Sequence, residues 1–64
     1  MNQTLQDLFT KIENSFYLMR HEARKAVDGN KSAGVRSRKE SSELVALLKQ
    51  WRAESIAAEK VSRP

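Results

Sequence analysis

Asp28-Gly29-Asn30 is the stretch of sequence that predicts a reversal of the chain. Glycine readily takes the left-handed conformation that closes a helix C-terminus, so Gly29 predicts that a first helix ends near Asp28. Asn30 suits either the turn or the N-cap of a second helix, and Asn2 or Thr4 suits the N-cap of the first. Because the turn is short, the two helices are expected to fold back as an antiparallel hairpin.

Apolar or small side chains recur at steps of three and four residues on both sides of this turn. Such spacing is typical of a coiled-coil seam and predicts an all-α fold. The expected helices cover about residues 3–28 and about 31–60, with a turn at about 29–31, in one helical hairpin domain over residues 1–64. The predicted seam comprises Leu5, Phe9, Ile12, Phe16, Met19, Ala23 and Ala26, then Gly34, Ser37, Ser41, Leu44, Leu48, Trp51, Ser55 and Ala58.

The large side chains of this predicted seam lie away from the turn and are expected to form the core and a dimer contact. They are Phe9, Ile12, Phe16, Met19, Leu44, Leu48 and Trp51. Further apolar residues flank the seam and widen the stripe beyond what one partner helix covers, which predicts a homodimer that forms a four-helix bundle. The alternative is a monomeric hairpin with an exposed apolar flank. The flanking residues are Leu8, Tyr17, Val27, Val45, Leu47 and Ile56.

Length and composition exclude several classes of protein. A chain of 64 residues without cysteine has neither disulfides nor thiolate metal sites, and it is too short to enclose a substrate cleft. His21 lacks both a metal-ligand set and a neighbouring nucleophile. We therefore expect no catalysis, cofactor, metal or small-molecule substrate. No apolar run is long enough to span a membrane, and no signal peptide is evident, so a cytoplasmic protein is expected.

Positive charge is concentrated around the predicted turn. The chain carries 12 Lys and Arg residues against 8 acidic ones. Seven of the cations but only two of the acids lie between Arg20 and Lys39, a segment named the basic tip, which therefore has a net charge of +5. The rest of the chain carries five cations and six acids, a net charge of −1.

Part of this cluster has a structural explanation, because three cations precede an acid by four residues. The expected pairs, each weak in this orientation, are Arg24 with Asp28, Arg36 with Glu40 and Lys39 with Glu43. Arg20, Lys31 and Arg38 have no acid at helical spacing within their own helix.

The remaining charge favours binding of a phosphate backbone. At 100° per residue, Lys31 and Arg38 share one face of the second helix and Arg36 projects from the other flank, an arrangement that contacts phosphates but reads no bases. Trp51 occupies a seam position, which favours core packing over base stacking. The candidate residues for DNA binding are Arg20, Arg24, Lys25, Asn30, Lys31, Ser32, Arg36, Arg38 and Lys39.

Two segments resemble a known family. Residues 29–39, GNKSAGVRSRK, and residues 51–60, WRAESIAAEK, are similar to the bacterial linker-histone-like family typified by the chlamydial histone-like protein. The resemblance implies a nucleoid-associated protein that binds double-stranded DNA with little sequence preference and helps to compact it. By position, Asn30, Lys31, Arg36 and Arg38 would be the family's turn and basic residues. Chlamydial members continue into a Lys- and Ala-rich tail, so a chain ending at Pro64 is expected to be a tail-less member that binds through its tips.

Two other functions remain open on the sequence alone. The wide apolar stripe also fits a protein-interaction module that docks the helices of a different partner. Structured RNA is a further candidate for the polyanion, because Lys and Arg recognise the phosphates of both nucleic acids.

Overall fold

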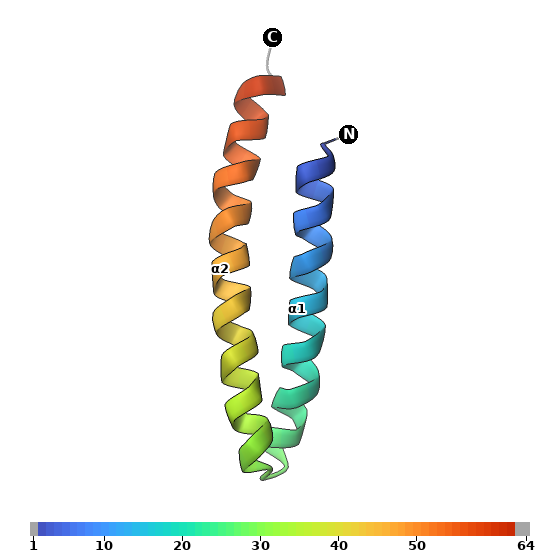
Figure 1. The fold of residues 1–64 in the computed structure, drawn as a ribbon, viewed down its shortest axis with the longest axis vertical. Coiled ribbons are helices and arrows are strands. Elements are labelled where there is room, and N and C mark those ends of the chain that lie inside the picture. Colours follow the sequence, from blue (N-terminus) through green and yellow to red (C-terminus); the bar gives the residue numbers. More distant parts are fainter. Residues whose placement is uncertain (1, 63–64) are drawn as a thin grey trace.

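Two antiparallel helices make up the fold (Figure 1). The computed structural model describes residues 2–62, with helix α1 at Gln3–Val27 and helix α2 at Lys31–Ser62. The hairpin is a rod with extents of 53 × 16 × 12 Å, and its turn lies at one end. The predicted all-α antiparallel hairpin is confirmed, and residues 2–62 contain no strand.

Asn2 begins α1. Its side-chain Oδ1 accepts a hydrogen bond from the backbone N–H of Leu5 at 3.1 Å, which satisfies one of the unpaired donors of the first turn. Thr4, the other residue that the sequence offered as a cap, lies inside the helix.

Gly29 and Asn30 make the turn. Gly29 has a φ of +99°, and its N–H donates to the Ala26 carbonyl at 3.0 Å. The Asn30 N–H donates to the Lys25 carbonyl at 3.1 Å, which completes a Schellman-type helix end. The Asn30 Oδ1 then accepts from the Ala33 N–H at 3.0 Å, so one residue ends α1 and caps α2.

The two glycines of the chain predict opposite effects on stability. Gly29→Ala forces a Cβ into the left-handed region and is expected to lower the free energy of unfolding by about 1–2 kcal/mol. In Gly34→Ala the new Cβ meets the Arg38 Nη1 at 3.5 Å and the Ala26 Cβ at 3.9 Å, both ordinary contacts. Removing a glycine from a helix interior should then add about 0.5–1 kcal/mol. Urea denaturation of both variants measures the signs, and a loss of stability in Gly34→Ala would contradict this account.

Small and aliphatic side chains close the contact between the helices. Leu8, Ser15 and Ala33 are buried, and the Ser15 hydroxyl has no hydrogen-bond partner. Of the seven large side chains of the predicted seam, four are half-buried: Ile12, Met19, Leu44 and Trp51. Phe9 also contacts Trp51, with ring centroids 6.2 Å apart and a tilt of 50°.

The predicted seam is wrong at three positions. Phe9, Phe16 and Leu48 remain 45%, 50% and 43% exposed, because the residue before each of them turns inward in its place. Those inward residues are Leu8, Ser15 and Leu47. The inward positions along each helix also step by three and four residues, but in the opposite order to the predicted seam. This difference turns Phe9, Phe16 and Leu48 outward.

The displaced side chains gather on one long edge of the hairpin. Each follows an inward residue by one position, and in antiparallel helices the positions displaced in this sense lie on the same side. Val45, 51% exposed, precedes Leu48 by about one helical turn and extends the same edge. We name Phe9, Phe16, Val45 and Leu48 the apolar edge.

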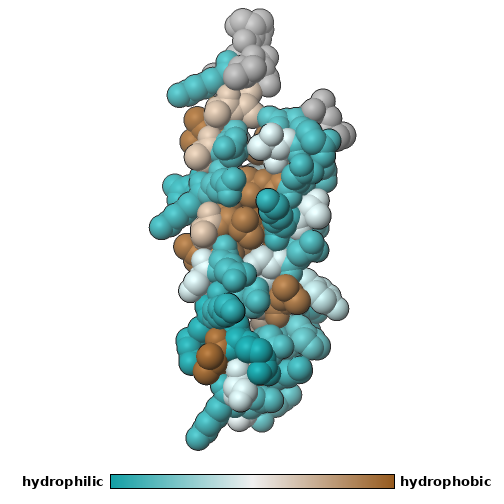
Figure 2. Space-filling view, in the orientation of Figure 1, coloured by the Kyte–Doolittle hydropathy of each residue, from teal (hydrophilic) through white to brown (hydrophobic). Residues whose placement is uncertain are grey.

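Figure 2 shows the surface from one side. Hydrophobic surface follows the line between the helices towards the open end, and hydrophilic surface dominates around the turn. Within the described residues, neither helix is long and apolar enough to cross a membrane.

Candidate functional site

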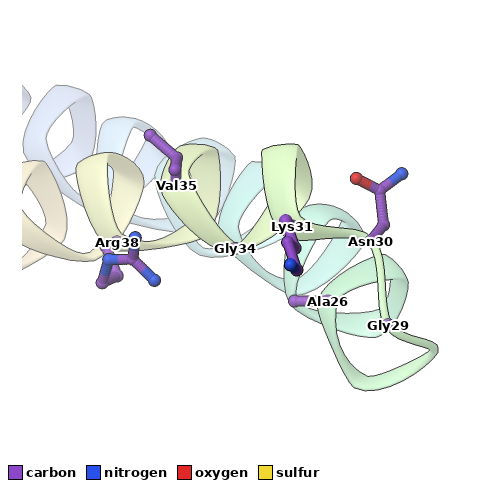
Figure 3. Close-up of a pocket in the computed structure, with 7 residues that line it drawn as sticks. All are labelled: Ala26, Gly29, Asn30, Lys31, Gly34, Val35 and Arg38. Atoms are coloured by element: carbon purple, nitrogen blue, oxygen red, sulfur yellow. The ribbon is translucent and has the colours of Figure 1, made fainter.

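Lys31 and Arg38 stand on the same side of α2 at the turn (Figure 3). They lie seven residues apart, which is about two helical turns, and Gly34 lies midway between them. The Arg38 guanidinium lies over Gly34, with its Nη1 at an ordinary contact distance of 3.5 Å from where a Cβ would be. The expectation that Lys31 and Arg38 share a face is confirmed.

An open hollow of about 540 Å³ extends between these two cations. Neither cation has a hydrogen bond or an ion pair with any residue that the structure describes. The N-terminal end of α2 adds the positive end of its helix dipole at the same place. The hollow is therefore positively charged and open to solvent. Its lining residues are Ala26, Gly29, Asn30, Lys31, Gly34, Val35 and Arg38.

Asn30 has a structural task at this site. Its side-chain oxygen is occupied by the Ala33 N–H, and its side chain points away from Lys31 and Arg38 (Figure 3). Asn30 thus fixes where α2 begins, and through this it sets the position of both cations.

Glu22 binds the cation on the opposite flank of α2. The Arg36 Nε–H donates to the Glu22 Oε2 at 2.9 Å across the two helices, and the Lys25 Nζ lies 4.0 Å from Oε1. The hydrogen bond from Arg36, aided by the charges of Arg36 and Lys25, holds the pKa of the Glu22 carboxyl below its ordinary value of 4.5. Arg36 is therefore neutralised within the hairpin, unlike Lys31 and Arg38.

This contact corrects the expected pairing within each helix. None of the three pairs at four-residue spacing, Arg24–Asp28, Arg36–Glu40 and Lys39–Glu43, forms among the described residues. Arg36 instead has a partner fourteen residues earlier in the chain. Sequence reasoning missed Glu22 because the register between the helices, which no local spacing reveals, brings it to Arg36.

Replacing Glu22 tests the cross-helix pair through its pH dependence. A carboxyl whose pKa is lowered on folding stabilises the folded state above its unfolded pKa, and this contribution is lost as the pH falls through the folded value. Wild type should therefore lose thermal stability below about pH 4 more steeply than Glu22→Gln. Thermal unfolding followed by circular dichroism measures the two slopes. Glu43→Gln, an exposed acid without a described ion pair, should behave as wild type, and equal slopes for wild type and Glu22→Gln would refute the pair.

The other candidate cations lie elsewhere on the basic tip. Arg20 and Arg24 line a second hollow, of about 210 Å³, together with Tyr17 and His21 on α1. Ser32 and Lys39 are exposed on α2 outside both hollows. The structure thus separates the predicted site residues into the open hollow at the turn, the Glu22 pair and the surface of α1. Among the described residues, no three acidic or histidine side chains are grouped so as to hold a metal ion.

A small helical hairpin with unpaired cations at its turn is a basic, all-α protein. The family model for Histone H1-like protein Hc1 matches residues 6–61, and the chain belongs to this family. The resemblance that the sequence predicted is confirmed, and with it a DNA-binding, histone-like class. No curated protein and no solved structure matches the chain.

Proposed function

We propose that this chain is a nucleoid-associated protein that binds the phosphate backbone of double-stranded DNA with little sequence preference and contributes to DNA compaction. The observation that carries the proposal is the pair of unpaired cations, Lys31 and Arg38, on one side of an open, positively charged hollow. Family membership supports the same partner.

The arrangement favours phosphates over bases. Lys31 and Arg38 lie about 10 Å apart along the axis of α2, a spacing that allows each to contact a different phosphate of one duplex. The hollow between them has no aromatic side chain to stack on a base and no carboxylate to accept from one. Arg36 adds to the field of the tip, but its Nε already donates to Glu22, which offsets part of its charge. Binding is then driven by charge and release of counterions.

A salt titration tests this function directly. Two phosphate contacts per hairpin predict that log K for a short duplex falls against log salt with a slope of about −1.8, and duplexes of different sequence should share that slope. Fluorescence anisotropy at several salt concentrations measures it. Salt-independent binding, or no binding at low salt, would refute the proposal. Tighter binding to an RNA duplex at the same salt would instead assign the site to structured RNA.

We further propose that two hairpins associate through the apolar edge. The hairpin exposes 5223 Å² of surface, whereas a compact monomer of 7.3 kDa exposes about 4,200 Å². The difference, about 1,000 Å², is close to the roughly 800 Å² that each partner buries in a standard interface. A second copy covering Phe9, Phe16, Val45 and Leu48 would remove this excess and produce a four-helix bundle with two basic tips.

A further inference from the structure

The face of α1 that points away from α2, named the outer face, changes in charge halfway along the helix. At 100° per residue, this face points about 160° away from the side chains that pack on α2. Its first half is uncharged or acidic and bonds to itself: the Gln3 Nε2 donates to the Asp7 Oδ1 at 2.8 Å, and the Thr10 hydroxyl donates to the Gln6 carbonyl at 3.0 Å. Its second half carries Tyr17, Arg20, His21 and Arg24 and contains no acid.

These four side chains surround the hollow of about 210 Å³ and leave their binding groups unused. None of them has a hydrogen bond, an ion pair or a ring contact with any described residue, although Asp28 follows Arg24 by four positions. Tyr17 is 66% exposed. One aromatic ring therefore lies next to two guanidinium groups and an imidazole, all open to solvent.

We propose that this face of α1 binds unpaired nucleotides of single-stranded nucleic acid, with phosphates at Arg20 and Arg24 and a base stacked on Tyr17. Side chains four residues apart on a helix are about 6 Å apart, so the two arginines form a short row of cations rather than one point charge. Arginine supplies planar, multiple donors that suit phosphate oxygens.

Tyr17 is what distinguishes the ligand. The bases of a duplex are stacked on one another and offer no free ring face at its edge, so a duplex gains nothing from an exposed tyrosine. A base in a single strand has a free face, and stacking on an aromatic side chain stabilises the complex with any base. An aromatic ring beside a row of cations is the combination that single-strand sites use.

This site is separate from the hollow at the turn. No residue lines both hollows, and the outer face of α1 points away from α2, which carries Lys31 and Arg38. The inference therefore does not rest on the proposed duplex binding, and the two sites are expected to be occupied at the same time.

The test compares a labelled single-stranded oligothymidylate with a short duplex at one salt concentration. Tyr17→Ala is expected to weaken binding of the single strand by about ten-fold and to leave duplex binding unchanged. Tyr17→Phe, which keeps the ring, should bind the single strand as wild type does. Arg20→Gln/Arg24→Gln should reduce the salt slope for the single strand by about 1.4. Lys49→Gln/Lys60→Gln removes the same charge from exposed positions on the body of α2 and is the matched control.

Each outcome decides between the possibilities. Equal affinity of Tyr17→Ala and wild type for the single strand would overturn the proposal, as would equal weakening of single-strand and duplex binding in Arg20→Gln/Arg24→Gln. In the second case the two arginines belong to the duplex site. Single-strand binding by a wild-type protein that does not bind duplex DNA would support this inference and refute the proposed function. Circular dichroism of each variant establishes that the helices are intact.

Discussion

Replacing Lys31 and Arg38 together with glutamine is expected to lower the affinity for duplex DNA by about 100-fold at about 50 mM salt and by about 8-fold at about 0.2 M salt. Both cations are exposed and have no partner among the described residues, so their loss removes phosphate contacts without breaking a contact in the fold. The salt slope should become less steep by about 1.8, and all duplex sequences should be affected alike. Fluorescence anisotropy over a range of salt concentrations measures both quantities.

Two controls distinguish the loss of the proposed site from a general loss of positive charge. Lys49→Gln/Lys60→Gln removes the same two charges at a distance from the turn and should weaken binding only slightly. Arg36→Gln should also have a small effect, because Glu22 already neutralises Arg36. If Arg36→Gln weakens binding as much as the double variant, the flank that carries Arg36 is the binding face, and the open hollow is not.

Phe16→Glu/Leu48→Glu is expected to dissociate the proposed dimer, with an increase of the dissociation constant of at least about 100-fold. Both side chains belong to the apolar edge, and two-fold symmetry would place four carboxylates in one interface, without partners. Removing a charge from water without pairing it costs several kcal/mol. Both residues are exposed in the single hairpin, so its helicity should persist. Sedimentation equilibrium measures the dissociation constant.

Leu18→Glu/Val35→Glu is the matched control, since both residues are at least half exposed and, at 100° per residue, point away from the apolar edge. This variant should associate as wild type does. A dimer that survives Phe16→Glu/Leu48→Glu but not the control variant would place the interface on another face. A wild-type chain that stays monomeric at high concentration would refute the dimer, and the apolar edge would then belong to a different protein partner.

Local chemistry explains why the turn could be predicted. Between two helical segments, a glycine followed by asparagine favours the end of one helix and the N-cap of the next. Every hydrogen bond of this turn joins residues within five positions of each other. The shared face of Lys31 and Arg38 was predictable for the same reason, because both lie on one helix.

The seam could not be chosen from spacing alone. Leu8 and Phe9 are both apolar neighbours, as are Leu47 and Leu48, so the sequence supports two seams of the same period. Choosing between them by apolar content favours Phe16 over Ser15, but the structure buries Ser15 and leaves Phe16 exposed. The register between helices decides this, and the same register brings Glu22 to Arg36.

The rod shape of the hairpin places the proposed polyanion site at the turn far from the two ends of the chain. The beginning of α1 and the end of α2 both lie at the end opposite the turn (Figure 1). The long dimension of the molecule is 53 Å, so a dye or a fused domain joined at either end stands far from a polyanion bound at the turn. Energy transfer from a labelled terminus to labelled DNA would therefore report whether the rod meets the duplex end-on or lies along it.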